Sequence, residues 1–277
     1  MVREKITFTG AQETLLATLY GRALDHRAPD PVLGDAEADR LVRSIDYDWR
    51  RAGINRGVAT GVAARAKLLD DWTAEFLAAC PEATVLHLAC GLDTRAHRLG
   101  PPPSVRWFDV DQPEVIDLRR RLMREPEGDY HMIGTSVTDD GWLERIPADR
   151  PVAAVFEGLS MYLREEEGHR LIERITTRFP SGQVLFDCYS RLGIRMQKLV
   201  PTIRRTGARL YWGIDDPHEL ERRHHGLTCL DAIRALQMPG LEKAPPAERL
   251  RLWVAAHLPG VRDAGLVLRY GFGRPRV

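Results

Sequence analysis

The sequence contains few cysteines, and they are not arranged as a metal site or a disulfide framework. Cys80, Cys90, Cys188 and Cys229 are scattered over 277 residues without a C-x-x-C pair. Disulfide-rich secreted domains and structural zinc sites need closely spaced cysteines. We therefore expect reduced thiols in a cytoplasmic protein, with Cys90 serving as a small residue in a turn.

Long apolar runs and an excess of charge are also missing. No stretch approaches the roughly 18 consecutive apolar residues of a membrane-spanning helix, so we expect no membrane association. Residues 1–8 lack the apolar core of a signal peptide, which again favours the cytoplasm. The 40 Lys and Arg nearly balance the 39 Asp and Glu, and the net charge of +1 gives no basic surface for nucleic acid.

The glycine fingerprint of a dinucleotide site is incomplete. Residues 85–95 read VLHLACGLDTR, an apolar run typical of a buried strand that breaks at Gly91. A pyrophosphate-binding turn needs G-x-G-x-x-G, but Ala89 stands at the first glycine position and Thr94 at the third. One glycine favours a nucleoside without phosphates, and S-adenosylmethionine is the common one.

A second short strand, residues 105–111, ends in two acids. Asp109 and Asp111 lie two residues apart, so the alternation of a strand puts both on one face. An acid at this point of a nucleotide-binding half binds the ribose hydroxyls. We expect one of the two to do so, and Gln112 to stand beside it.

The remaining chain alternates apolar strands with amphipathic helices, which predicts an α/β fold. Expected helices cover 11–27, 35–45, 55–79, 118–123, 165–179 and 245–257, and one begins at His218. Expected strands begin at Val85 and cover 105–111, 131–134, 152–156, 182–189, 226–230 and 265–273, the last antiparallel. In the helix 245–257, we expect Leu250, Trp253 and Val254 to face inward.

Three motifs, in this order, resemble the leucine carboxyl methyltransferase superfamily and its bacterial polyketide-type O-methyltransferases. They are LACGLDTR (88–95), DVDQP (109–113) and FEGLSMYL (156–163), and the resemblance covers roughly residues 15–190. It implies a class I S-adenosylmethionine-dependent methyltransferase fold, with a seven-stranded, mostly parallel sheet and helices on both faces. It also implies a helical cap (1–50) on a Rossmann-like domain (51–277), with a lid at about 190–225.

Arg65 stands among small residues in the middle of a predicted helix. From sequence alone it lies either on a solvated face or against a carboxylate, which a guanidinium binds through two parallel hydrogen bonds. The resemblance implies the second role, toward the methionine carboxylate of the cofactor. It also implies that Asp111 binds ribose, and a related branch has Asp-Leu at the adenine where this chain has Ser136 and Val137. The predicted cofactor-binding residues are Arg65, Ala89, Gly91, Asp109, Asp111, Gln112, Ser136, Val137, Glu157 and Gly158.

Glu157 follows an unbroken apolar strand, at the carboxyl edge where open sheets bind ligands. Packing explains an acid there poorly, and we expect it near the methionyl amine. Tyr162 either faces the site or belongs to the core. Arg95 is expected to form local salt bridges.

Basic residues punctuate the stretch after the fifth strand. They suit either a solvated face or an acidic acceptor, and Tyr211 with Trp212 suits either stacking on a planar acceptor or the core. The candidates for acceptor binding and catalysis are Tyr162, Arg191, Arg195 and His218, the last as general base if the acceptor is a phenol. No metal is predicted, because adjacent His224 and His225 would diverge by about 100° on a helix.

These observations favour methyl transfer from S-adenosylmethionine to a small secondary metabolite, with S-adenosylhomocysteine as the product. The first hypothesis is a carboxylate of a polyketide-like or related natural product, anionic and partly aromatic. The alternatives are a phenolic hydroxyl, the C-terminal carboxylate of a protein, and a non-catalytic cofactor-binding regulator. A short-chain NAD(P)-dependent reductase fits less well, because Glu166 occupies the lysine position of Tyr-x-x-x-Lys.

Overall fold

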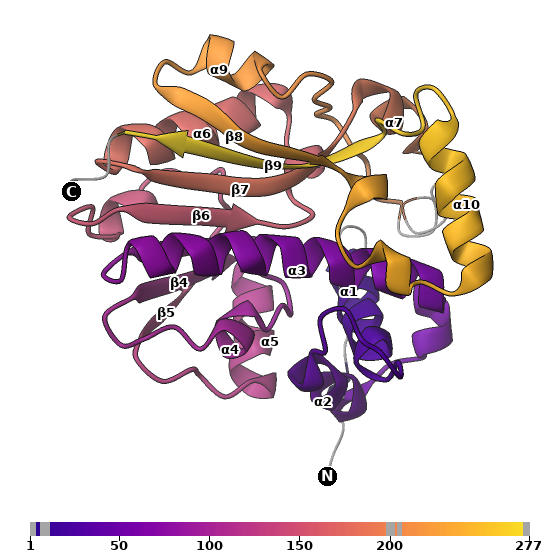
Figure 1. The fold of residues 1–277 in the computed structure, drawn as a ribbon. Helices are drawn as coiled ribbons and strands as arrows, with labels where there is room; N and C mark the ends of the chain where they lie inside the picture. Colours follow the sequence, from indigo (N-terminus) through magenta and orange to yellow (C-terminus); the bar gives the residue numbers. More distant parts are fainter. Residues whose placement is uncertain (1–3, 6–11, 198–202, 204–206, 274–277) are drawn as a thin grey trace.

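A central sheet with helices on both faces forms the body of the protein in the computed structural model, which describes residues 4–5, 12–197, 203 and 207–273 (Figure 1). The seven strands lie in the order β5-β4-β3-β6-β7-β9-β8. β9 runs antiparallel to β7 and β8, and the other neighbours are parallel. The strands are β3 (Thr84–Leu88), β4 (Arg106–Asp111), β5 (Asp129–Gly134), β6 (Val152–Phe156), β7 (Gly182–Tyr189), β8 (Leu227–Arg234) and β9 (Gly265–Phe272). The predicted seven-stranded, mostly parallel sheet is therefore confirmed.

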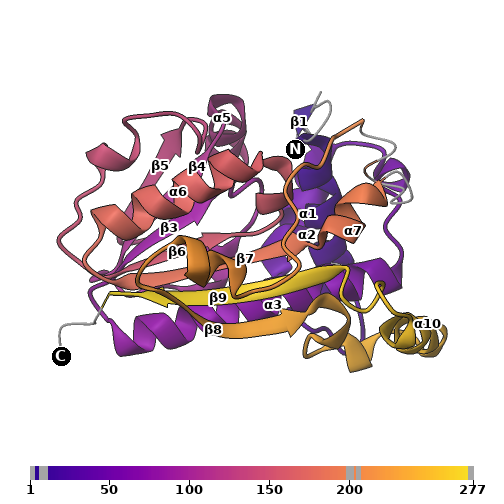
Figure 2. The same cartoon turned by 90° about the horizontal axis from the view of Figure 1, so that it is seen from above.

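The helices connect these strands and cover both faces of the sheet (Figures 1 and 2). The α-helices are α1 (Gln12–His26), α2 (Ala36–Ser44), α3 (Arg56–Ala79), α4 (Arg95–Leu99), α5 (Pro113–Leu122), α6 (Glu165–Arg178), α7 (Arg191–Arg195), α9 (Glu219–Arg223) and α10 (Pro246–His257). Short 3-10 turns are η1 (Trp49–Ala52), η2 (Leu143–Arg145), η3 (Ser160–Tyr162), η5 (Ala235–Gln237) and η6 (Leu241–Lys243).

Alternate residues of the central strands point into two separate hydrophobic cores, one on each face of the sheet. Val85 and Val155 pack with α3 side chains such as Leu69 on one face. Leu86 and Ala154 pack with α6 side chains and Leu220 of α9 on the other. Every residue of β3 and β6 is buried, as expected for central strands of a parallel sheet. The carboxyl ends of these parallel strands meet at one edge of the sheet, and the loops that follow β3 and β6 there are buried or half-buried.

The N-terminal helices lie against this edge. α1 packs on α2 and α3, and a two-residue parallel pairing joins β1 (Glu4–Lys5) to β2 (Ile45–Asp46). Arg22 of α1 donates to the carbonyl of Leu92 at 3.1 Å, and Thr94 Oγ1 donates to Asp35 at 2.6 Å. These contacts attach the helices of the predicted cap to the turn that follows β3.

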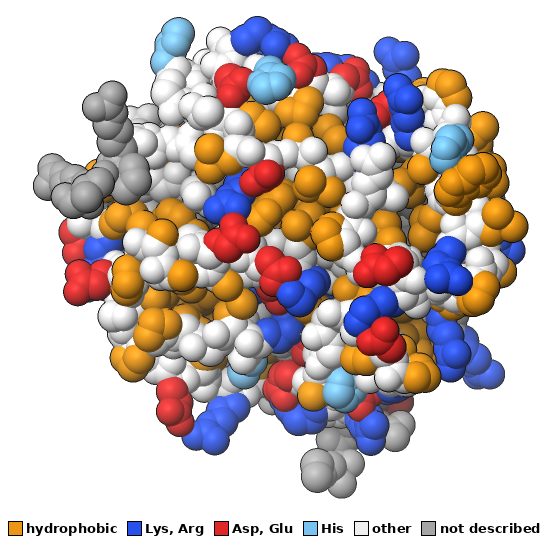
Figure 3. Space-filling view, in the orientation of Figure 1, with side chains coloured by type: hydrophobic (Ala, Val, Ile, Leu, Met, Phe, Trp, Pro, Cys, Tyr) orange, Lys and Arg blue, Asp and Glu red, His pale blue; other side chains and the backbone are white. Residues whose placement is uncertain are grey.

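Two expectations about helices differ from the structure. α5 begins at Pro113 rather than residue 118, because a proline at the first helical position needs no N–H partner and its φ is already suitable. The inward-facing assignment of α10 is wrong: Leu250, Trp253 and Val254 are 63%, 60% and 45% exposed. Figure 3 shows apolar side chains at the surface over α10, which lies at the edge of the molecule beyond the sheet. Leu252 packs inward instead.

Among the described residues, no helix combines the length and the apolar character that crossing a bilayer requires.

Candidate functional site

A cavity of about 420 Å³ opens at the carboxyl ends of the parallel strands. Its floor comes from the turn after β3 and from the ends of β4 and β6, while α1 and α3 supply walls. Its volume lies in the range of small-molecule sites, about 300–1,000 Å³. Most of the predicted cofactor residues line it: Arg65, Ala89, Gly91, Asp111, Gln112, Val137, Glu157 and Gly158.

The turn after β3 presents bare backbone to this cavity. Ala89 and Gly91 both have left-handed φ values, of 49° and 51°. The Gly91 amide donates to Asp111 Oδ2 at 2.7 Å, and the Gln112 amide donates to Asp111 Oδ1 at 2.7 Å. Burial raises the pKa of Asp111, while these two amide hydrogen bonds act in the opposite direction. Each carboxylate oxygen keeps a second lone pair with which it can accept from a ligand hydroxyl.

Arg119 fastens the same turn from behind, and the motifs did not point to it. Its Nη1 donates to the carbonyls of Gly91 and Asp93, at 2.9 and 2.8 Å. The side chain is fully buried and also pairs with Asp109. A signal was available: Val115, Leu118 and Arg119 share the buried face of α5, so helical spacing would have separated Arg119 from the exposed Arg120.

Asp109 does not line the cavity, contrary to the expectation that it binds the cofactor. It shares a strand face with Asp111, but it lies two residues deeper, about 7 Å from the sheet edge. His87 Nδ1 and Trp107 Nε1 each contact its Oδ1 at 2.8 Å, and Arg119 and Tyr130 contact Oδ2. Burial alone would raise the pKa of Asp109, but the charges of Arg119 and His87 hold it below the ordinary value. Asp109 therefore supports the turn from beneath.

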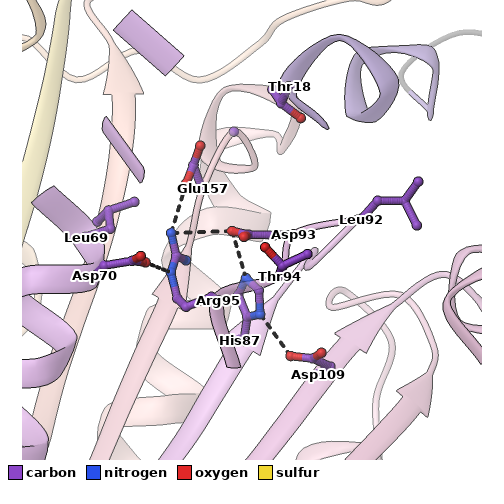
Figure 4. Close-up of polar contacts among 12 residues, drawn as sticks. Thr18, Leu69, Asp70, His87, Leu92, Asp93, Thr94, Arg95, Asp109 and Glu157 are labelled. Atoms are coloured by element: carbon purple, nitrogen blue, oxygen red, sulfur yellow. Dashed lines mark hydrogen bonds and ion pairs between the residues drawn. The ribbon is translucent and has the colours of Figure 1, made fainter. Parts of the chain in front are cut away.

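A chain of buried ion pairs runs from the turn to the end of β6 (Figure 4). Arg95 is fully buried and donates from Nη2 to Glu157 Oε2 at 2.9 Å and from Nε to Asp70 Oδ1 at 2.7 Å. Its Nη2 also lies 3.5 Å from Asp93 Oδ2. Figure 4 shows Arg95 between these three acids, and His87 between Asp93 and Asp109. Arg95 thus forms salt bridges as predicted, but only Asp93 is local in the sequence, whereas Asp70 and Glu157 come from distant segments.

Arg65 reaches the other side of Glu157. Its Nη2 lies 2.9 Å from Glu157 Oε1, and its Nη1 donates to Asp187 Oδ2 at 2.7 Å. Burial lowers the pKa of Arg65, but the charges of Asp187 and Glu157 outweigh that effect and raise it. Arg65 therefore does not lie on a solvated face, and α3 brings it to the carboxyl ends of β6 and β7.

The part of the cavity away from the turn is mainly apolar. Met161, Ile203 and Val62 line it together with two tyrosines, Tyr162 and Tyr189. Burial raises the pKa of both phenols, although a hydrogen bond with Thr14 opposes this at Tyr162. Both hydroxyls are therefore neutral near pH 7 and act as hydrogen-bonding groups rather than as bases.

Of the two residues predicted to contact adenine, Ser136 and Val137, only Val137 lines the cavity. Thr135 and Val137 line it, but Ser136 does not. The Ser136 hydroxyl lies 2.7 Å from Thr138 Oγ1, and its amide donates to Asp139 at 3.2 Å. Such local bonds of serine and aspartate stabilise a turn. Ser136 thus shapes the loop, and Val137 contacts the cavity.

The structure does not bring Arg191, Arg195 and His218 into the cavity. Arg191 is paired with Asp215 and Glu219, and the side chain is 45% exposed. His218 contacts Glu221 at 2.5 Å and is 64% exposed, and Arg195 is also exposed. Arg191 and Arg195 lie in α7 and His218 immediately precedes α9, and all three side chains turn to solvent, which sequence spacing could not reveal. The basic residues Lys198, Arg204 and Arg205 lie outside the described residues.

Trp212 and His224, which could have suggested acceptor stacking or a metal site, are buried among other side chains of the protein. Trp212 is buried 5.1 Å from the His169 ring, whereas Tyr211 is 47% exposed. His224 meets His169 at 3.0 Å rather than a metal-ligand set. Within the described part of the chain, no group of three or more His, Cys, Asp or Glu residues is arranged to hold a metal ion.

The sequence of this chain is similar to those of known methyltransferases. A family model described as "Leucine carboxyl methyltransferase" matches residues 15–176. The chain is 47% identical to the tetracenomycin polyketide synthesis O-methyltransferase TcmP of Streptomyces glaucescens, over 97% of this chain and 99% of that protein. It is 39% identical to the S-adenosyl-L-methionine-dependent methyltransferase dpfgK of Gibberella zeae, over 80% and 82% of the two chains.

A solved structure also shares the fold. The crystal structure of a Thermobifida fusca YX protein, provisionally described as a methyltransferase, superimposes with a TM-score of 0.61 at 18% identity. The match covers 96% of each chain. At this identity the similarity concerns the arrangement of the sheet and its helices.

Proposed function

Because the chain belongs to the leucine carboxyl methyltransferase family and is an S-adenosylmethionine-dependent O-methyltransferase, we propose that its acceptor is a carboxylate on a polyketide-like natural product. The name of TcmP, which resembles this chain over nearly its whole length, supports the polyketide part of the proposal. The carboxylate part depends on the chemistry of the cavity.

The observation that carries it is the lack of a free base among the described cavity residues. Glu157 is held by Arg65 and Arg95, and His87 contacts Asp109. Asp111 accepts two backbone amides, and the tyrosines are neutral. A phenol must lose a proton with a pKa near 10, whereas a carboxylic acid is already ionised at neutral pH. A cavity that orients its acceptor and takes no proton therefore suits a carboxylate.

The walls of the cavity support an acceptor that is largely apolar. Met161, Ile203 and Val62 surround the space beyond Glu157, and the hydroxyls of Tyr162 and Tyr189 are its polar groups there. Aromatic hydroxyls combine a flat apolar surface with a hydrogen-bonding tip. We assign the two tyrosines to the acceptor, with the hydroxyls orienting its carboxylate.

We assign the floor of the cavity to S-adenosylmethionine because its polar and charged groups match the parts of that molecule. Asp111 suits the ribose hydroxyls, the Ala89–Gly91 backbone allows close approach, and Thr135 with Val137 suits the adenine end. Arg65 and Glu157 offer one cation and one anion, which match the carboxylate and the amine of a methionine moiety. When bound, S-adenosylmethionine supplies a methyl group on a positively charged sulfur.

Methyl transfer to a carboxylate neutralises the carboxylate and the positively charged sulfur together, and it moves no proton. S-adenosylmethionine, held by Asp111, Arg65 and Glu157, would supply the methyl group: its C–S bond would break as the carboxylate C–O bond forms, and the sulfur would keep the electron pair. The products are a methyl ester and S-adenosylhomocysteine. The contribution expected of this chain is orientation in a mainly apolar cavity, since positioning alone can lower a barrier by several kcal/mol, about 7–11 in favourable cases.

We also propose that the described parts of residues 1–50 form a cap and those of about 190–225 form a lid over this site; residues 1–3, 6–11, 198–202 and 204–206 lie outside the described residues. The support is that Leu15 and Thr18 of α1 and Ile203 of the second segment line the cavity. A closed cover would exclude water, which strengthens electrostatic contacts inside.

The test uses cofactor with a labelled methyl group and two matched acceptors. One is an aromatic polyketide that carries a carboxylic acid and a phenol, and the other is the same compound with the acid removed. We expect label only on the first, in a product that mild base hydrolyses. A base-stable methyl ether would instead identify the phenol as the acceptor. Labelling of peptide C-termini would favour a protein substrate, and cofactor binding without turnover on any acceptor would favour a regulator.

A further inference from the structure

Asp187 connects three parts of the site, although no sequence motif contains it. It lies near the carboxyl end of β7, and its side chain is buried. Oδ2 accepts from Arg65 Nη1 at 2.7 Å, and Oδ1 accepts from the Gly158 amide at 2.6 Å. Its backbone carbonyl accepts from Ser160 Oγ, also at 2.6 Å. Asp187 therefore ties α3, the turn after β6 and η3 together.

The two acids that flank Arg65 are held differently. Glu157 pairs with Arg65 through Oε1 and with Arg95 through Oε2. The second oxygen of Asp187 is occupied by the amide of Gly158 instead. If a ligand carboxylate and amine separated Arg65 from Glu157, Glu157 would keep Arg95 and Arg65 would keep Asp187. Neither charge would then be left buried and unpaired, which is the costly arrangement.

The same carboxylate fixes the backbone next to Glu157. Gly158 has a φ of 67°, in the left-handed region that favours glycine. Its amide points at Asp187 Oδ1, so the position of this turn depends on an acceptor from the neighbouring strand. The direction of the Glu157 side chain follows from the path of the turn.

From these contacts we propose that Asp187 is a positioning residue. It holds the Arg65 guanidinium and the Glu157–Gly158 turn where they receive the carboxylate and amine of the cofactor's amino-acid end. This inference rests on the proposed function, which assigns Arg65 and Glu157 to that end.

The experiment compares two ligands that differ only in the amino-acid end. S-adenosylhomocysteine carries it, whereas 5′-deoxy-5′-methylthioadenosine has the same nucleoside and thioether without it. Calorimetry measures the Kd of both for the full chain and for Asp187→Asn, which keeps an acceptor for the Gly158 amide and loses the charge beside Arg65. We expect Asp187→Asn to raise the Kd of S-adenosylhomocysteine by about tenfold or more, which is the scale of a hydrogen bond to a charged group. The Kd of methylthioadenosine should change less than about twofold.

Two results would overturn the inference: an unchanged Kd for S-adenosylhomocysteine, or an equal loss for both ligands, which indicates general distortion. The matched control is Asp117→Asn, the same substitution at an exposed aspartate that pairs with Arg120 outside the cavity. If Asp187→Asn does not fold, Asp187→Glu keeps the charge but moves its oxygens by one methylene. It should also weaken S-adenosylhomocysteine selectively, and an equal effect on both ligands there would count against the inference.

Failure of the proposed function would appear differently. An enzyme that methylates no carboxylate would still show the ligand-selective effect of Asp187→Asn, and the inference would stand. A wild-type chain that binds S-adenosylhomocysteine no more tightly than methylthioadenosine would remove the assignment of Arg65 and Glu157, and the inference with it.

Discussion

The Asp111 carboxylate accepts a hydrogen bond from the Gly91 amide at 2.7 Å, across 20 residues of chain. This contact joins the end of β4 to the turn after β3, and the adjacent Gln112 amide occupies the second oxygen. Asp111 thus organises the floor of the cavity while its remaining lone pairs stay available to a diol. It combines a structural role with the binding role that we propose.

We expect Asp111→Ala to raise the Kd for S-adenosylhomocysteine about 10- to 100-fold, because hydrogen bonds to a charged acceptor contribute about 1.5–3 kcal/mol each. Asp111→Asn should have a smaller effect, since it keeps one acceptor oxygen. Calorimetry checks both. Asp117→Ala, on the exposed face of α5, is the control and should bind as the wild type does. Wild-type affinity in Asp111→Ala would remove this residue from the site.

The turn itself predicts a stabilising substitution. Ala89 is the one non-glycine residue with positive φ, at 49°, in the part of the chain that the structure describes. A Cβ in this region costs roughly 1–2 kcal/mol, offset in part by the greater freedom of glycine in the unfolded chain. We expect Ala89→Gly to raise the free energy of unfolding by about 1 kcal/mol in urea titrations. Ala74→Gly, on the exposed face of α3, should lower it by about 1 kcal/mol. A loss of stability in Ala89→Gly would contradict the strain argument.

Two buried histidines should give opposite pH dependences of stability. Burial lowers the pKa of His87, but the charge of Asp109 and the hydrogen bonds to Asp109 and Asp93 outweigh it, so the pKa is raised. A folded pKa above the unfolded value of about 6.5 stabilises the protein fully below pH 6.5. That contribution is lost as pH rises through the folded pKa. The difference in unfolding free energy between wild type and His87→Gln should therefore shrink from about pH 6.5 upward, and a difference that grows would be the wrong sign.

His169 should behave in the reverse way. Burial, followed by the charges of Arg223 and His224, lowers its pKa to about 4, and Glu165 opposes this only weakly. The folded state then resists protonation that the unfolded chain accepts below about pH 6.5. The advantage of wild type over His169→Gln should therefore fall as pH drops from about 6.5 toward 4. Urea titrations of the two glutamine variants at matched pH values serve as controls for each other, and stability differences that change with pH in the same direction would refute at least one assignment.

The basic residues that sequence reasoning assigned to the acceptor should prove dispensable. We expect the triple variant Arg191→Gln, Arg195→Gln, His218→Gln to keep kcat/KM within about threefold of wild type, because exposed charges outside the cavity contribute little. Tyr162→Phe and Tyr189→Phe, which change groups that line the cavity, should each lower it by more, about fivefold to tenfold for one hydrogen bond. Initial rates with a carboxylic acid acceptor check both. A triple variant slower than the tyrosine variants would restore the basic residues to the site.

Much of the fold was predictable because its information is local in the chain. Apolar runs such as 152–156 identify buried parallel strands, and such strands place the residues that follow them at one edge. For that reason Gly91, Asp111 and Glu157 could be expected together, although they span 66 residues. The antiparallel last strand and the long helix that carries Arg65 were predicted by the same patterns.

The sequence by itself thus determined the order of strands and helices, and which chain segments meet at the cavity edge. Tertiary structure alone decided the depth and direction of single side chains. Asp109 and Asp111 share a face, but only packing showed that one is saturated beneath the turn. Arg191 and His218 turn to solvent and Trp253 is exposed, because the rotation of a short or peripheral helix depends on its neighbours. Asp187 reaches the Gly158 amide only because β7 pairs with β6 in the sheet. A contact between strands is set by the register of the sheet and not by spacing along the chain.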